Sequence, residues 1–168
     1  TLGITPERAK QVAFSDPYAA IEIGLLAPQK SPVAKAEDLS GKSAGVARAS
    51  TQDQSLTAVA PKDARIMRFD DDASAVQALL SGQVDADFLD TAIVLAEAKA
   101  TGKLEVVGQY QTGEKYGAIY PKGSANEAAL DKGISTLISD GSLNTLSKTY
   151  LGPAFGGDPS AVPVWTIK

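Results

Sequence analysis

The chain has 168 residues but neither cysteine nor histidine. Without cysteine there are no disulfide bonds, no thiol chemistry and few ways to build a zinc site, although an oxidising compartment remains compatible. Without histidine the commonest general base and metal ligand is missing, so a metal site would need oxygen ligands alone. The only acidic run, at residues 70–72, lacks the spacing of a calcium loop. We interpret it as charge at a helix start, which suits the helix dipole.

Strong charge of one sign and long apolar runs are absent too. There are 16 Lys and Arg residues against 20 Asp and Glu, a net charge of −4. With no basic cluster, a nucleic-acid partner is not indicated. No apolar run reaches the roughly 18 residues of a membrane-spanning helix. No signal peptide opens the chain, and a start at Thr1 rather than Met leads us to expect a processed or truncated form.

Strand and helix patterns alternate, which predicts an α/β fold with a mainly parallel sheet. The expected strands are 21–28, 43–47, 65–69, 85–89, 104–109 and 116–121, and the expected helices are 51–59, 73–80, 91–100, 125–140 and 142–150. Capping boxes at Thr51-x-x-Gln54 and Ser124-x-x-Glu127 are expected to begin two of these helices. The Gly- and Pro-rich tail from residue 153 is expected to be irregular.

Three places supply the groups that a free amino acid requires, namely a cation, aimed N–H donors and an anion. Thr5 and Pro6 predict a short helix that directs Arg8 and backbone amides at one point, a geometry suited to a carboxylate. The turn at Ser50 and Thr51 precedes a helix and offers further donors. Asp90 follows a strand, where open α/β sheets bind ligands.

Each of these residues also has a purely structural interpretation. Arg8 could form a surface salt bridge. Thr51 and Asp90 could serve only as helix N-caps, although capping and ligand contact are compatible.

Motifs follow one another in a distinctive order over residues 1–152. They are Thr1–Arg8, Phe14–Tyr18, Glu37–Lys42, Gly45–Val46, Ala49–Thr51, Phe69–Asp70, Ala78–Gly82, Val84–Ala86, Asp90, Tyr116–Lys122, Asp140–Gly141 and Tyr150–Gly152. In this order and spacing the chain resembles the polar amino-acid-binding proteins that serve ABC importers. The tail from Pro153 to Lys168 lies outside the resemblance.

The resemblance implies an α/β fold of the periplasmic binding protein type II kind, with two lobes joined by a two-segment hinge. Residues 24–111 would form a complete parallel-sheet lobe, residues 1–17 and 117–168 a remnant of the other lobe, and residues 18–23 and 112–116 the hinge. The family's opening βαβαβ portion has no counterpart in this sequence. A separate complementing N-terminal segment, self-association by domain swapping, or truncation would each account for this, and truncation is favoured.

The resemblance also implies a binding site. Arg8 would hold the α-carboxylate of an amino acid together with the Ser50 and Thr51 amides, Asp90 would hold the α-amine, and Gly3 would offer its backbone. Thr1 aligns with a position that often contacts ligand. Gly3 stands where the family usually has a hydroxyl, and Ala49 stands where a glycine is common. No cofactor and no metal are implied.

The implied function is non-catalytic. The protein would capture a polar amino acid or related zwitterion by hinge closure and deliver it to the membrane permease of an ABC importer. It would act in the periplasm after signal-peptide removal, or as a lipid-anchored extracellular protein of a Gram-positive organism. A receptor's ligand-sensing module is one alternative. A cyclohexadienyl dehydratase-like enzyme is another, disfavoured because Ile93 stands where that enzyme has its catalytic Glu and cannot transfer a proton.

Overall fold

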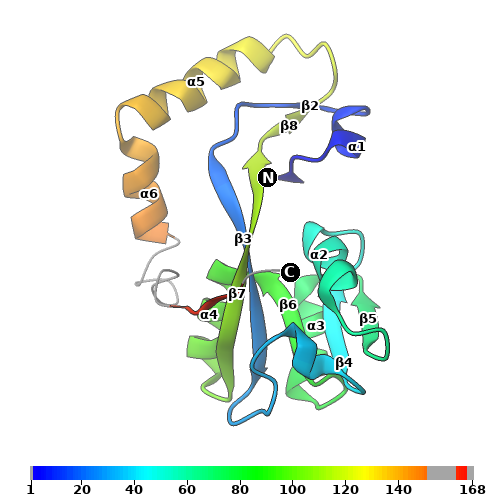
Figure 1. Cartoon of the computed structure of the whole chain (residues 1–168). Helices are drawn as coiled ribbons and strands as arrows, with labels where there is room; N and C mark the ends of the chain where they lie inside the picture. The colour runs from blue at the N-terminus through cyan, green and yellow to red at the C-terminus, as the bar shows by residue number, and fades with distance from the viewer. Residues whose placement is uncertain (1, 151–161, 166–168) are drawn as a thin grey trace. The chain divides into compact units, whose positions relative to one another are not determined.

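The computed structural model describes residues 2–150 and 162–165, and the chain divides into two compact units (Figure 1). Unit 1 comprises Thr1–Ile21 and Gly113–Tyr150, and unit 2 comprises Glu22–Thr112 and Leu151–Lys168. The chain therefore passes from one unit to the other after Ile21, after Thr112 and after Tyr150. The first two of these boundaries fall inside the ranges 18–23 and 112–116 that the resemblance implies as a hinge.

The sheet of unit 2 is mixed rather than purely parallel. Its strands are β3 (Ala19–Pro28), β4 (Ser43–Ala47), β5 (Arg65–Phe69), β6 (Ala86–Asp90), β7 (Leu104–Gly117) and β9 (Val164–Trp165). β4 pairs in parallel with both β5 and β6, whereas β3 pairs antiparallel with β6. The parallel pairs among β4, β5 and β6 correspond to the expectation from the sequence, whereas the antiparallel β3 departs from it.

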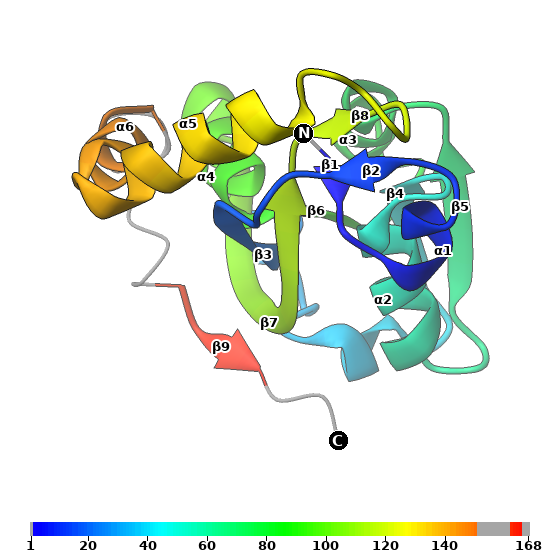
Figure 2. The same cartoon turned by 90° about the horizontal axis from the view of Figure 1, so that it is seen from above.

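Helices cover both faces of this sheet. α2 (Thr51–Val59) joins β4 to β5, α3 (Asp72–Leu80) joins β5 to β6, and α4 (Thr91–Thr101) follows β6; the short 3₁₀ helix η1 is Ala36–Leu39. The chain moves outward from β4 to β5 and then back to β6, so right-handed crossovers place α2 and α3 on opposite faces (Figure 2). An apolar cluster between strands and helices of unit 2 comprises Leu26, Val76, Ala78, Leu79, Val84, Leu89, Val94 and Leu104.

Close packing of α4 on β3 depends on Gly24. A Cβ at this position would overlap the Val94 side chain and lie 3.3 Å from the Thr91 Cα. Glycine therefore allows the helix that begins after Asp90 to lie directly against the sheet.

β7 runs without interruption through residues 111–114, where the sequence suggested a break between two strands. Gly113 has a φ of +72°, so the single glycine produces a local irregularity in the strand instead of a turn.

The tail also departs from expectation. The sequence predicts an irregular tail belonging to the first lobe, but Val164 and Trp165 form β9, which pairs in parallel with β7 in unit 2. The Trp165 ring packs edge-on against Tyr110 at a centroid distance of 5.1 Å. This long-range contact has no local signal in the sequence.

Unit 1 is built from short strands and three helices. They are β1 (Leu2–Gly3), α1 (Pro6–Ala9), β2 (Ala13–Phe14), β8 (Ile119–Tyr120), α5 (Glu127–Ser139) and α6 (Ser142–Tyr150). β1 pairs antiparallel with the end of β7, and β2 pairs antiparallel with β8. The N-cap of α5 is Asn126, without a side-chain cap bond, so the capping box expected at Ser124 and Glu127 does not form. Ser124 instead accepts a hydrogen bond from the Asn126 amide.

Candidate functional site

The candidate cation Arg8 is placed by a short helix, as its sequence predicts. Thr5 is the N-cap of α1 and its hydroxyl oxygen accepts a hydrogen bond of 3.2 Å from the Arg8 amide, while Pro6 occupies the first helical position. The Arg8 Nη1 donates a hydrogen bond of 2.9 Å to the Gly3 carbonyl oxygen. The Gly3 backbone, which the resemblance assigns to the ligand, thus orients the guanidinium.

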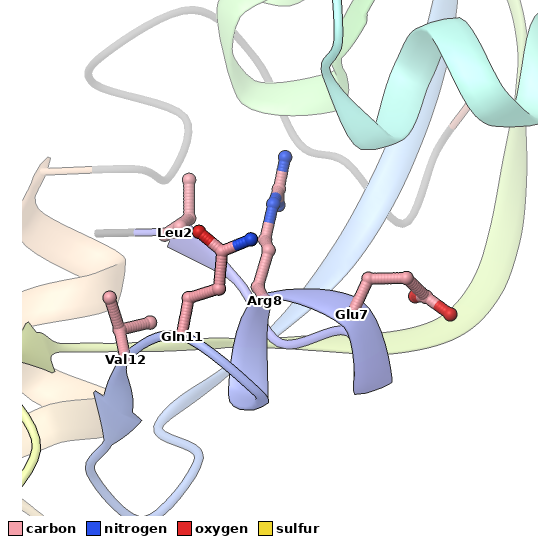
Figure 3. A pocket seen from close by; sticks show the side chains of 5 residues that line it. All are labelled: Leu2, Glu7, Arg8, Gln11 and Val12. Carbon is pink, nitrogen blue, oxygen red and sulfur yellow. The ribbon is translucent and has the colours of Figure 1, made fainter.

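Arg8 also lines a surface pocket of about 220 Å³ within unit 1, together with Leu2, Glu7, Gln11 and Val12. In Figure 3 the Arg8 and Leu2 side chains extend to the same side of α1, whereas Glu7 projects in another direction. Complete small-molecule sites enclose roughly 300–1,000 Å³. The pocket of unit 1 is therefore smaller than a complete small-molecule site.

The remaining candidate residues lie at one edge of the unit 2 sheet. β4 and β6 are parallel neighbours, with Val46 paired to Phe88. Their carboxyl ends therefore lie side by side, and the segments that follow them bring the Ser50 turn and Asp90 to the same edge. Thr1 is outside the described residues.

Ser50, not Thr51, caps α2. The Ser50 hydroxyl oxygen accepts a hydrogen bond of 3.0 Å from the Asp53 amide and donates one of 2.7 Å to the Ala47 carbonyl oxygen. Thr51 is the first helical residue and is buried. The expected box from Thr51 to Gln54 is thus shifted by one residue, and Ser50-x-x-Asp53 is the pattern that would have identified it.

Asp90 is the N-cap of α4, as expected, and its Oδ1 accepts a hydrogen bond of 3.2 Å from the Ala92 amide. The surroundings of Asp90 are acidic, since Asp71 and Asp72 lie nearby. Burial, and then the charges of Asp90 and Asp71, raise the pKa of Asp72. A negative potential of this kind favours a bound ammonium group.

A fully buried carboxyl group beneath this edge escaped the sequence analysis. Asp87 lies in β6 with 0% exposure, and neither of its carboxyl oxygens has a hydrogen-bond partner. Burial, and then the Asp72 charge, raise the pKa of Asp87 to about 7. In the sequence, only the position of Asp87 in the apolar run from Ala86 to Leu89 indicates that it is buried.

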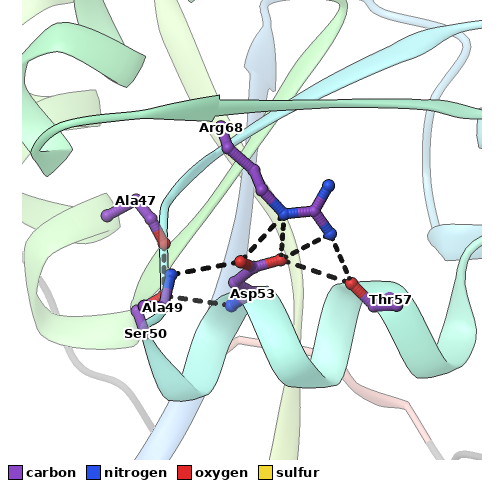
Figure 4. A network of polar contacts seen from close by, with 6 residues as sticks. All are labelled: Ala47, Ala49, Ser50, Asp53, Thr57 and Arg68. Atoms are coloured by element: carbon purple, nitrogen blue, oxygen red, sulfur yellow. Dashed lines mark hydrogen bonds and ion pairs between the residues drawn. The ribbon is translucent and has the colours of Figure 1, made fainter.

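The sequence also did not reveal a polar network around Asp53, drawn in Figure 4. Arg68 Nε lies 2.9 Å from both carboxyl oxygens of Asp53, and Arg68 Nη2 lies 2.9 Å from Oδ1. The Ala49 amide donates to Asp53 Oδ2 at 3.2 Å, and the Thr57 hydroxyl donates to Oδ1 at 3.3 Å. Arg68 and Asp53 lie 15 residues apart on different elements, so no local pattern links them.

The described residues also bear on three other properties: metal binding, membrane insertion and catalysis at the dehydratase position. Within 2–150 and 162–165, no three His, Cys, Asp or Glu side chains are grouped so that they could hold a metal ion. In the same part of the chain, no helix combines the length and apolarity required to span a bilayer. Ile93, at the place of the dehydratase's catalytic Glu, packs against the apolar cluster of unit 2.

Comparison with known proteins places these features in a family. The family described as bacterial extracellular solute-binding proteins, family 3, matches residues 1–153. The ABC transporter glutamine-binding protein GlnH of Bacillus subtilis is 34% identical over 154 residues, which cover 90% of this chain and 56% of that protein. The L-cystine-binding protein TcyJ of Escherichia coli is 30% identical over 154 residues, covering 89% of this chain and 57% of that protein.

A solved structure shows the same fold. The arginine-, lysine-, histidine-binding protein ArtJ of Geobacillus stearothermophilus superposes with a TM-score of 0.78 at 33% identity, covering 90% of this chain and 67% of that protein. The chain thus spans little more than half the length of the curated relatives, 56% and 57% for GlnH and TcyJ. The fold is that of the type II periplasmic binding proteins, and its sheet is mixed where a mainly parallel one was expected.

Proposed function

Because the chain belongs to family 3 of the bacterial extracellular solute-binding proteins, we propose that it is the binding portion of a non-catalytic protein that captures an amino acid outside the cytoplasm. The proposed ligand is the zwitterion of a polar amino acid. Relatives named for glutamine and cystine support this ligand class. The partner in this proposal is the membrane permease of an ABC importer, and the place of action is the periplasm or, in a Gram-positive organism, the outer surface through a lipid anchor.

In the proposed complex, each end of the zwitterion has its own protein groups. The Arg8 guanidinium binds the α-carboxylate, because its planar fork matches two carboxylate oxygens. The Ser50 and Thr51 amides, at the positive end of the α2 dipole, bind the same carboxylate. Asp90 binds the α-ammonium group, and Gly3 takes part through the carbonyl that orients Arg8.

The observation that carries the proposal lies within unit 2. The start of α2 and the Asp90 carboxylate follow neighbouring parallel strands, so a donor set and an anion share one sheet edge. A zwitterion needs both within the span of one amino-acid backbone. Hinge closure at residues 18–23 and 112–116 would add Arg8 of unit 1, with the ligand bridging both units.

Calorimetric titration of the full-length protein with the twenty L-amino acids tests the proposal. We expect Asp90→Asn to weaken binding roughly 100-fold or more, because the bound ammonium loses its counter-charge in a desolvated site. The matched control is Asp71→Asn, since Asp71 caps α3 as Asp90 caps α4. Asparagine caps helices well, so both variants keep their helices and only Asp90→Asn should lose ligand. Equal affinities in the two variants would remove Asp90 from the site.

A further inference from the structure

The turn that presents the α2 amides has a backbone conformation that its sequence disfavours. Ala49 has a φ of +58°, in the left-handed region that glycine adopts readily and alanine does not. A non-glycine residue in this region is strained, because its Cβ lies too close to the following carbonyl oxygen. Something in the surrounding structure must therefore hold Ala49 in place.

The Asp53 carboxylate makes the contact that holds it. It accepts the Ala49 N–H at 3.2 Å, while the Asp53 amide donates to the Ser50 hydroxyl at 3.0 Å. In an ordinary capping box the third helical residue binds the N-cap amide. Here Asp53 reaches one residue further back, so it fixes Ala49 as well as Ser50.

Arg68 in turn fixes Asp53. Its Nε contacts both carboxyl oxygens at 2.9 Å, and its Nη2 contacts Asp53 Oδ1 and the Thr57 hydroxyl, each at 2.9 Å. Such charge-assisted, multidentate contacts set orientation as well as energy. The Asp53 side chain is only 12% exposed, so it has little freedom to move elsewhere.

We infer that Arg68 and Asp53 are positioning residues for the carboxylate of the ligand, because their ion pair holds the left-handed Ala49 turn that aims the first amides of α2. This inference rests on the proposed function, in which those amides bind the α-carboxylate. Neither residue touches the ligand in this mechanism. The pair compensates for the alanine that stands where the family commonly has glycine.

Arg68 has a second, electrostatic effect on the same turn. Burial would raise the pKa of Asp53, but hydrogen bonds from Arg68 and Ala49 outweigh burial and hold this pKa below its usual value. Asp53 is therefore ionised at neutral pH, and an unpaired charge there would repel an incoming carboxylate. Arg68 neutralises it.

The decisive variant is Arg68→Gln in the full-length protein, with Arg48→Gln as the matched control. Arg48 follows β4 beside the same turn and pairs with Asp70 at 3.1 Å on the surface, with side chains 61% and 84% exposed. Both variants lose one positive charge, but only Arg68→Gln releases Asp53. Hydrogen exchange of the Ala49 amide, followed by NMR without ligand, should accelerate in Arg68→Gln and stay unchanged in Arg48→Gln. Unchanged exchange in Arg68→Gln overturns the inference, whatever the protein binds.

Ligand selectivity provides the second measurement. The probes are L-glutamine and L-arginine, each paired with its decarboxylated amine, 4-aminobutanamide or agmatine, in competition calorimetry. For a probe that the unaltered protein binds, Arg68→Gln should weaken the amino acid about tenfold and the amine less than about twofold. Equal losses for both would mean a general structural role and would overturn the inference. Absence of amino-acid binding by the unaltered protein would count against the proposed function, and the exchange measurement would still decide the inference.

A double variant guards against misfolding. Ala49→Gly combined with Arg68→Gln introduces a residue that adopts the left-handed conformation at no steric cost. We expect this double variant to recover part of the affinity that Arg68→Gln loses, because glycine restores the turn while the Asp53 charge stays unpaired. Failure to recover it would show that Arg68 does not act through the turn.

Discussion

Helices α3 and α5 make an instructive comparison between the two units. Both carry an apolar stripe at helical spacing. In unit 2 the α3 stripe lies on the sheet, and Val76 and Leu79 are 4% and 2% exposed. In unit 1 the α5 stripe stays open, and Leu130 and Ile138 are 45% and 46% exposed. Periodicity therefore predicts which face of a helix is apolar, but whether that face is buried depends on the layer beside it.

The forces that hold the two units differ accordingly. α5 is attached to its surroundings through polar contacts, including a hydrogen bond of 2.9 Å from the Tyr120 hydroxyl to Asp131 and one of 3.3 Å from the Ser135 hydroxyl to Asp16. Single hydrogen bonds contribute only about 0.5–1.5 kcal/mol each, whereas apolar burial contributes roughly 25 cal/mol per Å². Most of the folding free energy should therefore come from unit 2.

Truncation of a buried aromatic ring should show the difference between the two units in the free energy of unfolding most clearly. Phe88 is 0% exposed and stacks on Tyr110 with centroids 6.1 Å apart. We expect Phe88→Ala to lower the free energy of unfolding by about 3–5 kcal/mol, through lost burial and a residual cavity. The matched change in unit 1 is Leu137→Ala, at a side chain 38% exposed, and should cost less than about 1 kcal/mol. Denaturant titration followed by Trp165 fluorescence and circular dichroism measures both, and similar costs would contradict the comparison.

Titration of Asp87 should have the next largest effect on the free energy of unfolding. The folded-state pKa is about 7 against an ordinary 3.8, so between these values the folded protein holds a proton that the unfolded chain has released. Stability is therefore full below about pH 4 and falls by about 1.4 kcal/mol per pH unit until the folded-state pKa is passed. Unfolding measured from pH 4 to 8 should show this slope, and Asp87→Val should abolish it.

Asp140 in unit 1 provides the control for that slope. Hydrogen bonds from the Ser142 hydroxyl and amide lower the pKa of Asp140, so its contribution to stability is lost only as the pH falls through this lowered pKa. Asp140→Asn should leave the decline between pH 4 and 7 intact. A decline that persists in Asp87→Val would assign it to another group.

Glycine-to-alanine exchanges should change the free energy of unfolding least. The change should be a loss in unit 2 and a gain in unit 1. A Cβ at Gly108 would overlap the Trp165 ring, so Gly108→Ala should displace β9 and cost about 1–3 kcal/mol. Nothing lies within 4 Å of a Cβ at Gly133 in α5, and Gly133→Ala should stabilise by about 0.5–1 kcal/mol. Trp165 is the only tryptophan, so a red shift of its emission in Gly108→Ala alone reports the displacement. An unshifted spectrum would contradict the packing of β9.

Sequence patterns anticipated much of unit 2. Strands β4 and β5 and helix α2 have the bounds that local pattern and turn residues predict, and Asp90 caps α4 as expected. The short helix before Arg8 also forms as predicted. These features depend on neighbours within a few positions along the chain, which is the range that capping and periodicity describe.

Features that join distant segments could not be predicted in this way. The Gln111–Glu114 segment has the residues of a turn, yet β7 continues through it. Val164 and Trp165 form β9, because Trp165 packs against Gly108 and Tyr110 of β7.

The sequence by itself determined the local helices and strands of unit 2 such as β4, α2 and β5, the family and the residue types available for binding a zwitterion, because each follows from local order along the chain. Only the tertiary structure decided that Arg68 forms an ion pair with Asp53, that Asp87 is buried without a hydrogen-bond partner, and that the apolar face of α5 is exposed. Burial and ion pairing depend on which surfaces meet in space, and one-dimensional spacing does not encode that beyond a few residues.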